Sequence, residues 1–283
     1  MQLFSEIFRA CGKFSFLEKM STKIVGILNI TPDSFSDGGK FDSLDSALTQ
    51  LKKLLEDGAD AIDIGAESTR PKATPIGPGE EWRRLEKILP ALIIEVKKFS
   101  TKTAKKIPIS IDSYHFETIQ KAQQAGVDIV NDVSGLVDEK IIQFIAEKNL
   151  QTILMHNLAI HANPELLINC HLHLVEEILT WARHKISYLA GCGVKKSQLI
   201  FDPGIGFAKD ALQSIRILKN IEGFRVLGLP LYVGHSKKSF LDAVNIEGDR
   251  ASKTLESSKF LIAKNVEFLR VHDVGAHRKI LGT

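Results

Sequence analysis

The segment Lys23–Gly39 reads KIVGILNITPDSFSDGG, and it introduces a pattern that the rest of the chain repeats. Its first part, Lys23–Asn29, is apolar and β-branched, which is typical of a strand buried in a parallel sheet. Its second part, Thr31–Gly39, is rich in turn-forming residues and predicts a loop. The segment is therefore an apolar strand that ends in a polar residue and opens into a loop.

Seven further apolar runs follow this scheme, and segments of helical period, such as residues 44–55 and 80–98, lie between them. The polar residues at the eight strand ends are Asn29, Asp63, Asp112, Asn131 with Asp132, His156, Asp202, His235 with Ser236, and Arg270 with His272. Eight such strand–helix units predict an α/β fold, a (β/α)8 TIM barrel with its active site at the carboxyl ends of the strands. The 283 residues leave room for one barrel of about 250 residues, so we expect a single domain over residues 23–283.

Charge and cysteine content exclude several classes of function. The 37 basic and 34 acidic residues give a net charge of +3, too balanced to indicate nucleic-acid binding. No apolar run approaches the roughly 20 residues of a membrane span. The three cysteines, Cys11, Cys170 and Cys192, lack Cys-x-x-Cys spacing and indicate free thiols in a reducing cytoplasm.

Residues 1–22 precede the first predicted strand, and we expect them to form a separate amino-terminal extension. Charged residues interrupt any apolar core there, so the segment does not resemble a secretion signal. Leu3, Phe4, Ile7, Phe8 and Cys11 follow helical spacing instead. The extension is expected either to dock on the barrel as a short amphipathic helix, or to be a linker left from a fusion or a contact with a partner.

The first strand end and its loop carry two residues of chemical interest. The amide oxygen of Asn29 could take one place on Mg2+, with waters and substrate phosphates as the other ligands. Equally, Asn29 could cap the loop by hydrogen bonds to the backbone. Phe35 lies in a polar loop where nothing local would bury it, and it could close over a ring-bearing ligand.

Three acceptor-bearing residues, Asp112, Asn131 and Asp202, are predicted to surround the barrel mouth. Their oxygens suit the N–H groups of an aminopyrimidine, as carboxylates do at exposed base edges. The alternative for each residue is that it caps the helix that follows. Three acceptors around one mouth favour recognition of a heterocycle.

Cationic residues at other strand ends indicate an anionic group on the ligand. Arg70, beside Thr69, offers a planar fork that suits phosphate or carboxylate. The sequence GHSKKS around Lys238 places donors at a predicted helix start, where an anion can bind. Arg270 and His272 alternate along the last strand and so point to the same side, where Arg270 could lie on a ring while His272 donates to phosphate.

Eight motifs in order carry a resemblance that runs from about Ile24 to His277. They are NITPDSFSDGG, DIGAESTRP, SIDSYH, VNDVSG, LMH, DPGIGF, GHSKKS and RVHDV. With them the chain resembles the dihydropteroate synthases. The resemblance implies a transferase of folate biosynthesis that condenses 6-hydroxymethyl-7,8-dihydropterin diphosphate with p-aminobenzoate, through a carbocation-like pterin, to give 7,8-dihydropteroate and diphosphate.

The resemblance also implies a role for each matching residue. The pterin would be held by Asp112, Asn131, Asp202, Lys238 and Arg270. Arg270 would stack over the pterin and help to bind the diphosphate, which His272 and Asn29 would hold with Mg2+. The p-aminobenzoate site would be shaped by Phe35, Thr69, Arg70, Pro71, Phe207 and Ser239. Asp37 would stabilise the cation or accept the amine proton, so the catalytic set is Asp37, Lys238 and Arg270.

The family is usually a homodimer and is sometimes fused behind the pyrophosphokinase that makes its substrate, so a homodimer and such an association are expected here. The chain departs from the family after His156, where NLAIHANP replaces a Met-Gln-Gly-x-Pro stretch. Two alternatives remain open. A pterin-binding methyltransferase domain would have no use for the triplet Ser68–Arg70. A catalytically silent pterin-binding protein would not need the diphosphate-binding residues.

Overall fold

The computed structural model describes residues 22–31, 42–69, 73–160, 167–168, 173–244 and 246–282. Within them, eight parallel strands form one sheet in the order β6-β5-β4-β3-β2-β1-β8-β7. The strands are β1 (Lys23–Asn29), β2 (Ala61–Gly65), β3 (Ile109–Asp112), β4 (Ile129–Asp132), β5 (Gln151–Met155), β6 (Leu199–Asp202), β7 (Tyr232–Val233) and β8 (Phe268–Val271). A parallel bridge between Phe201 and Leu231 joins β6 to β7. The sheet is thus rolled into a barrel, and the predicted (β/α)8 fold is confirmed.

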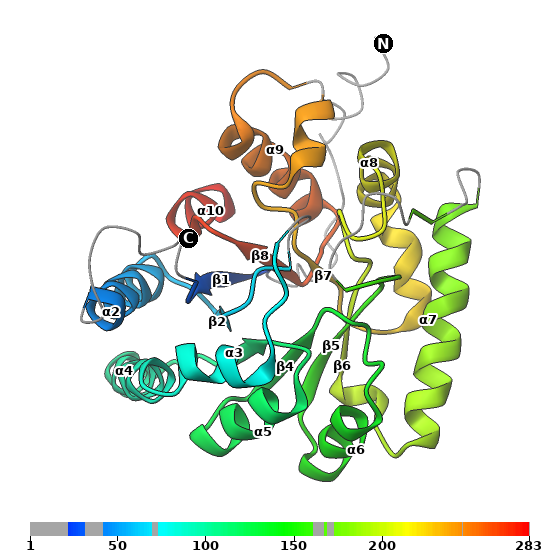
Figure 1. The fold of residues 1–283 in the computed structure, drawn as a ribbon. Coiled ribbons are helices and arrows are strands. Elements are labelled where there is room, and N and C mark those ends of the chain that lie inside the picture. Colours follow the sequence, from blue (N-terminus) through cyan, green and yellow to red (C-terminus); the bar gives the residue numbers. More distant parts are fainter. Residues whose placement is uncertain are drawn as a thin grey trace.

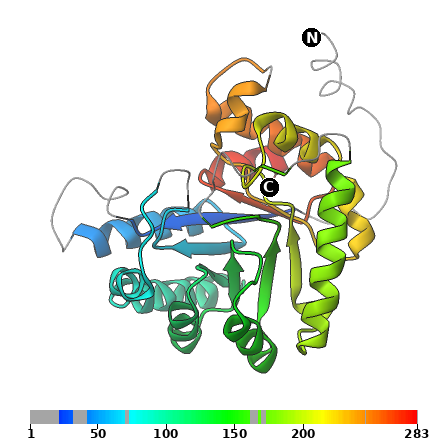
Figure 2. The ribbon, with the colours of Figure 1, turned by 45° about the vertical axis from the view of Figure 1, so that its right-hand side comes forward.

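Helices surround the strands (Figure 1; Figure 2). They are α2 (Asp42–Glu56), α3 (Pro78–Leu85), α4 (Ile88–Thr103), α5 (Phe116–Ala125), α6 (Glu139–Lys148), α7 (Leu174–Gly191), α8 (Ala211–Lys219), α9 (Arg250–Ala263) and α10 (Val274–Leu281), with 3-10 turns η2 (Lys196–Gln198), η3 (Ile221–Leu227) and η4 (Ser239–Ala243). Several helices begin at an Asp that accepts a backbone N–H, as Asp138 does for α6.

The single helix expected over residues 80–98 is instead two helices, α3 and α4. Pro90 explains the break. Its ring would clash with the carbonyl of Glu86, four residues earlier, if one helix ran through both positions. The segment GHSKKS likewise leads into the short 3-10 turn η4 and not into an α-helix.

The alternation of side chains along each strand places the polar strand ends inside the barrel. Near the amino ends, an inner apolar cluster is formed by Val25, Ala61, Ile129, Ile153, Ile200 and Tyr232, with Phe268 against it. Successive side chains of a strand point to opposite faces, so every second residue points inward. Two residues beyond Ala61, Ile129, Ile200 and Phe268 stand Asp63, Asn131, Asp202 and Arg270. This polar layer therefore lies directly above the apolar one, toward the carboxyl ends of the strands.

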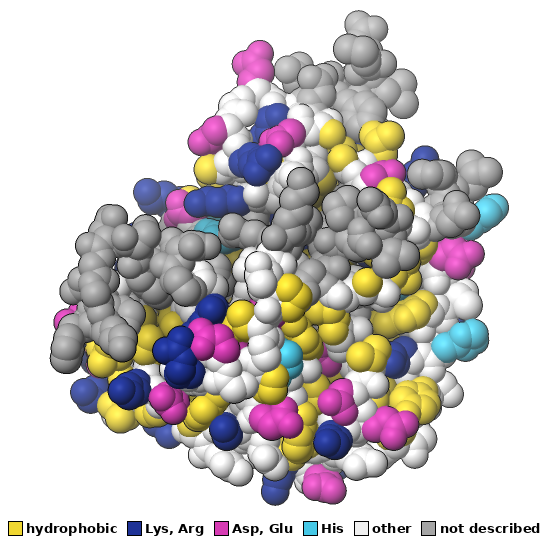
Figure 3. All heavy atoms as spheres, viewed as in Figure 1, with side chains coloured by type: hydrophobic (Ala, Val, Ile, Leu, Met, Phe, Trp, Pro, Cys, Tyr) yellow, Lys and Arg dark blue, Asp and Glu magenta, His cyan; other side chains and the backbone are white. Residues whose placement is uncertain are grey.

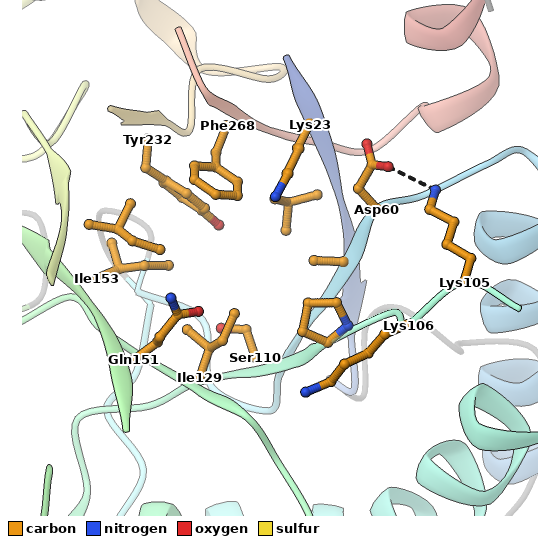
Figure 4. A pocket seen from close by; sticks show the side chains of 14 residues that line it. Lys23, Asp60, Lys105, Lys106, Ser110, Ile129, Gln151, Ile153, Tyr232 and Phe268 are labelled. Atoms are coloured by element: carbon orange, nitrogen blue, oxygen red, sulfur yellow. Dashed lines mark hydrogen bonds and ion pairs between the residues drawn. The ribbon is translucent and has the colours of Figure 1, made fainter. Parts of the chain in front are cut away.

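A cavity of about 350 Å³ opens at the amino end of the barrel, away from the polar layer (Figure 4). Its walls include the small residues Ala61 and Ser110 and the first residues of several strands, among them Lys23. The hydroxyl of Tyr232 points into the cavity, as Figure 4 shows, and neither it nor the Ser110 hydroxyl has a hydrogen-bond partner in the described part of the chain. Because Ala61 and Ser110 are small, a space remains in front of them that the ring of Tyr232 does not fill.

The surface shows no segregation of charge on the face seen in Figure 3, where basic and acidic side chains are interspersed. Of the helices that the structure describes, none has the length and apolar character needed to span a bilayer. Cys192 is a free thiol, while Cys11 and Cys170 lie outside the described residues. Residues 1–21 also lie outside them, so the amino-terminal extension stays a prediction.

Candidate active site

The centre of the polar layer is a guanidinium held between two carboxylates. Arg270 donates from Nε to Oδ2 of Asp63 at 2.5 Å and from Nη2 to Oδ2 of Asp112 at 2.7 Å. Asn131 donates from Nδ2 to the same oxygen of Asp63 at 3.2 Å. Side chains from β2, β3, β4 and β8 are thus joined in one hydrogen-bonded group. Three of the predicted pterin residues, Asp112, Asn131 and Arg270, are brought together there.

Asp63 is the residue of this centre to which the sequence analysis gave no role. Its side chain is fully buried, and its Oδ1 has no hydrogen-bond partner among the described residues. The sequence does indicate that Asp63 is important, because it is a charged residue at an inward position of an otherwise apolar strand. Its partner Arg270 lies 207 residues away, however, and spacing along the chain does not reveal such a pair.

Burial controls the ionisation of this centre. It raises the pKa of Asp112 to about 7, and the pairing with Arg270 offsets only part of that effect. Burial works against the charge on Arg270 as well, yet Asp63 and Asp112 together raise its pKa above the ordinary value. The guanidinium therefore stays charged, while Asp112 titrates near neutral pH.

A second group forms around Asp202 at the end of β6. Its Oδ1 accepts from the N–H of Gly204 at 2.7 Å, and burial raises the pKa of its carboxyl. Gly204 is required because its φ is +71° and because a Cβ there would lie 2.0 Å from the carbonyl oxygen of His156. Asp202 thus combines a local turn bond with a side chain directed into the barrel.

Lys238 and Phe207 lie against each other beside Asp202. The ammonium of Lys238 is 4.4 Å from the centre of the Phe207 ring and donates to the carbonyl of Ile205. Burial lowers the pKa of Lys238 to about 8, although Asp202 acts to raise it. The predicted pterin residue Lys238 and the predicted p-aminobenzoate residue Phe207 are therefore neighbours.

Lys209 links this group to β5, and it too was missed from the sequence. Its Nζ is buried, donates to the carbonyl of Phe207 at 2.9 Å and lies 2.8 Å from Nδ1 of His156. Burial lowers the pKa of Lys209 to about 7 and that of His156 to about 2. His156, the polar end of β5, thus accepts from Lys209 as a neutral ring and helps to fix the loop after β6.

The remaining predicted residues lie around the rim. His272 at the end of β8 is bonded through Nδ1 to the hydroxyl of Ser236 at 2.9 Å, which orients its ring. Ser239 is exposed at the start of η4, and Thr69 is partly buried in the loop after β2. Asn29 is partly buried at the end of β1. The other predicted residues, Phe35, Asp37, Arg70 and Pro71, lie outside the described residues, so their roles stay predictions.

The donor set around Asn29 fits a weakly held divalent ion better than a protein-enclosed metal. Within the described residues, no three His, Cys, Asp or Glu side chains gather in a metal-binding group. Mg2+ commonly binds through one or two protein oxygens and takes its other ligands from water and substrate phosphates. The amide oxygen of Asn29 is compatible with that mode.

Comparison with known proteins places the chain in a family. The family described as "Pterin binding enzyme" matches residues 25–272. The dihydropteroate synthase of Synechocystis sp. is 40% identical over 265 residues, which cover 92% of this chain and 88% of that protein.

Two solved structures show the same barrel. One is dihydropteroate synthase from Anaplasma phagocytophilum with bound 6-hydroxymethylpterin-monophosphate, at 34% identity and a TM-score of 0.82, covering 93% of this chain and 97% of that one. The other is the Xanthomonas albilineans enzyme with 4-aminobenzoic acid, at 30% identity and a TM-score of 0.80, covering 92% and 91%. The chain belongs to the dihydropteroate synthase family, the pterin-binding transferases of folate biosynthesis.

Proposed function

We propose that this chain condenses 6-hydroxymethyl-7,8-dihydropterin diphosphate with p-aminobenzoate to give 7,8-dihydropteroate and diphosphate. The observation that carries the proposal is the inward layer in which Asp112, Asn131 and Asp202 surround Arg270 and Lys238. Acceptors and cations are thereby combined in one buried mouth. A ligand with a ring rich in N–H groups and a polyanionic substituent needs both.

The acceptors are proposed to hold the pterin ring. An ionised carboxylate accepts from the adjacent N–H groups of an aminopyrimidine, and the amide of Asn131 can both donate and accept. Arg270 is held by Asp63 and Asp112, so its planar group has a fixed orientation against which a flat ring can lie. Burial of these groups excludes water from the face of the ring.

The cations are proposed to assist departure of the diphosphate. In the reaction, the bond between the pterin methylene carbon and the diphosphate oxygen breaks, and the electron pair leaves with the oxygen. Arg270 and Lys238 would hold the charge that develops there, and His272 would donate a hydrogen bond to the diphosphate. Mg2+ on Asn29 would neutralise part of the diphosphate charge when bound.

The amine nitrogen of p-aminobenzoate then forms the new C–N bond and loses a proton. Phe207, next to Lys238, offers a flat apolar surface for the benzoate ring, and Thr69 and Ser239 offer hydroxyls at the rim. The predicted residues Phe35, Arg70 and Pro71 would complete this site, and Asp37 would stabilise the cation or accept the proton. No covalent intermediate with the protein is required.

The deciding experiment is to mix the protein with the pterin diphosphate and Mg2+ and to follow diphosphate release with and without p-aminobenzoate. Release that depends on p-aminobenzoate, together with dihydropteroate formation, supports the proposal. If no diphosphate is released when both substrates are present, the synthase proposal is wrong. Pterin binding without any release would favour the catalytically silent alternative, and methyl transfer from a methylated pterin would favour the methyltransferase.

We further propose a homodimer. Three large apolar side chains are exposed on neighbouring elements, Tyr188 on α7, Leu212 on α8 and Val226 on η3, and the last two are 67% and 66% exposed. Single exposed apolar side chains are also common on monomers, so the homodimer is proposed from the family resemblance, and these three side chains are candidate contacts. Analytical ultracentrifugation should give twice the mass of the chain, and Leu212→Glu should shift it toward the monomer. The predicted association with the upstream pyrophosphokinase stays a prediction.

A further inference from the structure

The loop that leaves β2 is fastened at its base by the carboxylate of Glu67. Glu67 is the second residue after β2, and only 2% of its side chain is exposed. Its Oε1 accepts from the hydroxyl of Tyr114 at 2.7 Å and from the N–H of Ile76 at 3.1 Å. Its Oε2 lies 3.0 Å from Nε2 of His115. Both carboxylate oxygens are therefore bonded to other segments of the chain.

These bonds also join the two ends of the loop to each other. Ile76 follows Glu67 by nine residues, and its carbonyl oxygen lies 3.0 Å from the same Nε2 of His115. When the His115 proton is on Nε2, the ring donates to both ends of the loop at once. Arg84 adds a bond from Nη1 to the carbonyl of Ala66 at 2.9 Å. The base of the loop is thus closed, and Thr69 stands within it.

Glu67, Ile76, Tyr114 and His115, joined by these bonds, are called the clamp below. Two of its residues belong to the segment that follows Asp112, a residue of the candidate pterin site. Tyr114 and His115 lie two and three residues beyond Asp112. Ser113 lies between β3 and these two residues in the sequence. Its hydroxyl donates to the buried carboxylate of Glu81 on α3 at 2.8 Å. The clamp therefore connects the loop that carries Thr69 to the strand that carries Asp112.

We propose that Glu67 is a positioning residue that sets where Thr69 stands relative to the pterin pocket, and that it thereby determines the affinity for p-aminobenzoate. The inference rests on the proposed function, in which Thr69 helps to form the p-aminobenzoate site. A buried carboxylate with both oxygens bonded is held in one orientation. Thr69 follows it by only two residues, a reach of roughly 7 Å, so its freedom is limited by the clamp.

Two variants of different severity test the role. Glu67→Gln keeps the size of the side chain but places an amide where the carboxylate meets Tyr114 and His115. Tyr114→Phe removes a single hydroxyl. We expect the KM for p-aminobenzoate to rise about tenfold to a hundredfold in Glu67→Gln and about threefold to tenfold in Tyr114→Phe, the range for lost bonds to a buried charge. The affinity for 6-hydroxymethylpterin monophosphate should stay within about twofold of the parent, because Asp112, Asn131 and Asp202 are not altered.

The matched control is Arg83→Gln on α3, the helix whose Arg84 bonds to the carbonyl of Ala66. Arg83 is 66% exposed and pairs with Glu80 at 2.7 Å, so its loss should leave both substrates unaffected. The double variant of Glu67 and Tyr114 should raise the KM by less than the product of the single effects, because both changes act on the same bonded group.

The outcomes separate this inference from the proposed function. A KM for p-aminobenzoate that stays within about twofold of the parent in Glu67→Gln would show that the clamp does not position the site. Equal losses of kcat and of pterin affinity would also overturn the inference, since they indicate general damage to the barrel. A parent protein that releases no diphosphate with p-aminobenzoate would overturn the proposed function itself.

Discussion

The substitution Asp63→Asn tests how the central guanidinium and carboxylates set the ionisation of the pterin site. Asp63 and Asp112 accept from Nε and Nη2 of the same guanidinium, at 2.5 Å and 2.7 Å. That arrangement places the two carboxylates roughly 5 Å apart across the planar fork. The charge of Asp63 is one of the causes that raise the pKa of Asp112 to about 7. Removal of that charge should lower the pKa of Asp112.

The size of the effect follows from Coulomb's law. Two unit charges roughly 5 Å apart interact with about 3 kcal/mol at an effective dielectric constant of 20. This upper value corresponds to about two pKa units, and solvent near the mouth of the barrel will reduce it, so we expect the pKa of Asp112 to fall by about 1 to 2. The variant also leaves Arg270 with Asp112 as its remaining carboxylate partner in the central group, which acts in the same direction.

The assay is the affinity for 6-hydroxymethylpterin monophosphate between about pH 5 and pH 9, around the neutral-pH titration of Asp112. The ionised carboxylate is the form that accepts N–H bonds, so affinity should rise as the pH rises through the pKa of Asp112 and level off above it. In Asp63→Asn the midpoint of this rise should move to lower pH by about 1 to 2 units. Lost bonds from Arg270 and Asn131 should cost about 1.5–3 kcal/mol in the free energy of unfolding, which urea denaturation measures.

Asp132→Asn is the matched control. It removes another buried carboxylate, on the neighbouring strand β4, whose Oδ1 accepts from the backbone of Ser134 at 2.7 Å. Asp132 raises the pKa of Asp112 less than Asp63 does, so the midpoint should move less. A midpoint that is unchanged in Asp63→Asn, or that moves upward, would refute the reasoning. A parent whose pterin affinity does not change across this pH range would refute the assignment of Asp112 to the pterin.

Three further substitutions have definite expected results. Lys238→Ala should weaken pterin binding about tenfold or more while the thermal unfolding temperature changes little, because the residue is only partly buried; unchanged affinity in a calorimetric titration would show that the lysine is wrongly assigned. Arg270→Ala should lower both pterin affinity and kcat, because the guanidinium orients the ring and holds developing charge; a loss in only one of them would contradict this double role. Tyr232→Phe should leave the free energy of unfolding unchanged or raise it by about 1 kcal/mol, because a buried hydroxyl without a partner among the described residues is removed; a loss larger than about 1 kcal/mol in urea denaturation would show that the hydroxyl is hydrogen-bonded.

The strand ends could be read from the sequence because the period of a strand is fixed. Asp112, Asn131 and Asp202 each end an apolar run, and parallel strands bring such ends to one edge. The structure confirms that Asp112 and Asn131 belong to one bonded group with Arg270. Local rules therefore sufficed to place these side chains at the same mouth.

The contacts between strands could not be read in this way. Asp63 can be recognised from the sequence as a charged residue in an apolar strand, but its bond to Arg270, 207 residues away, cannot. Lys209 follows a glycine-rich segment, and its contact with His156, 53 residues earlier, connects the loop after β6 to the end of β5. Such pairs depend on the curvature of the closed barrel, which the pattern of a single strand does not contain.

The balance of charge in the buried mouth bears on the proposed metal. Three carboxylates, Asp63, Asp112 and Asp202, face three cations, Arg270, Lys238 and Lys209. Burial pushes Asp112, Lys238 and Lys209 toward their neutral forms, so protonation of a carboxyl can be matched by deprotonation of a neighbouring lysine. A dihydropterin ring is neutral and leaves this balance intact, but its diphosphate adds negative charge that the balanced mouth does not neutralise. Arg270 and Lys238 are proposed to hold part of this charge as it develops, and the remainder is proposed to be met at the rim, by His272 and by Mg2+ on Asn29.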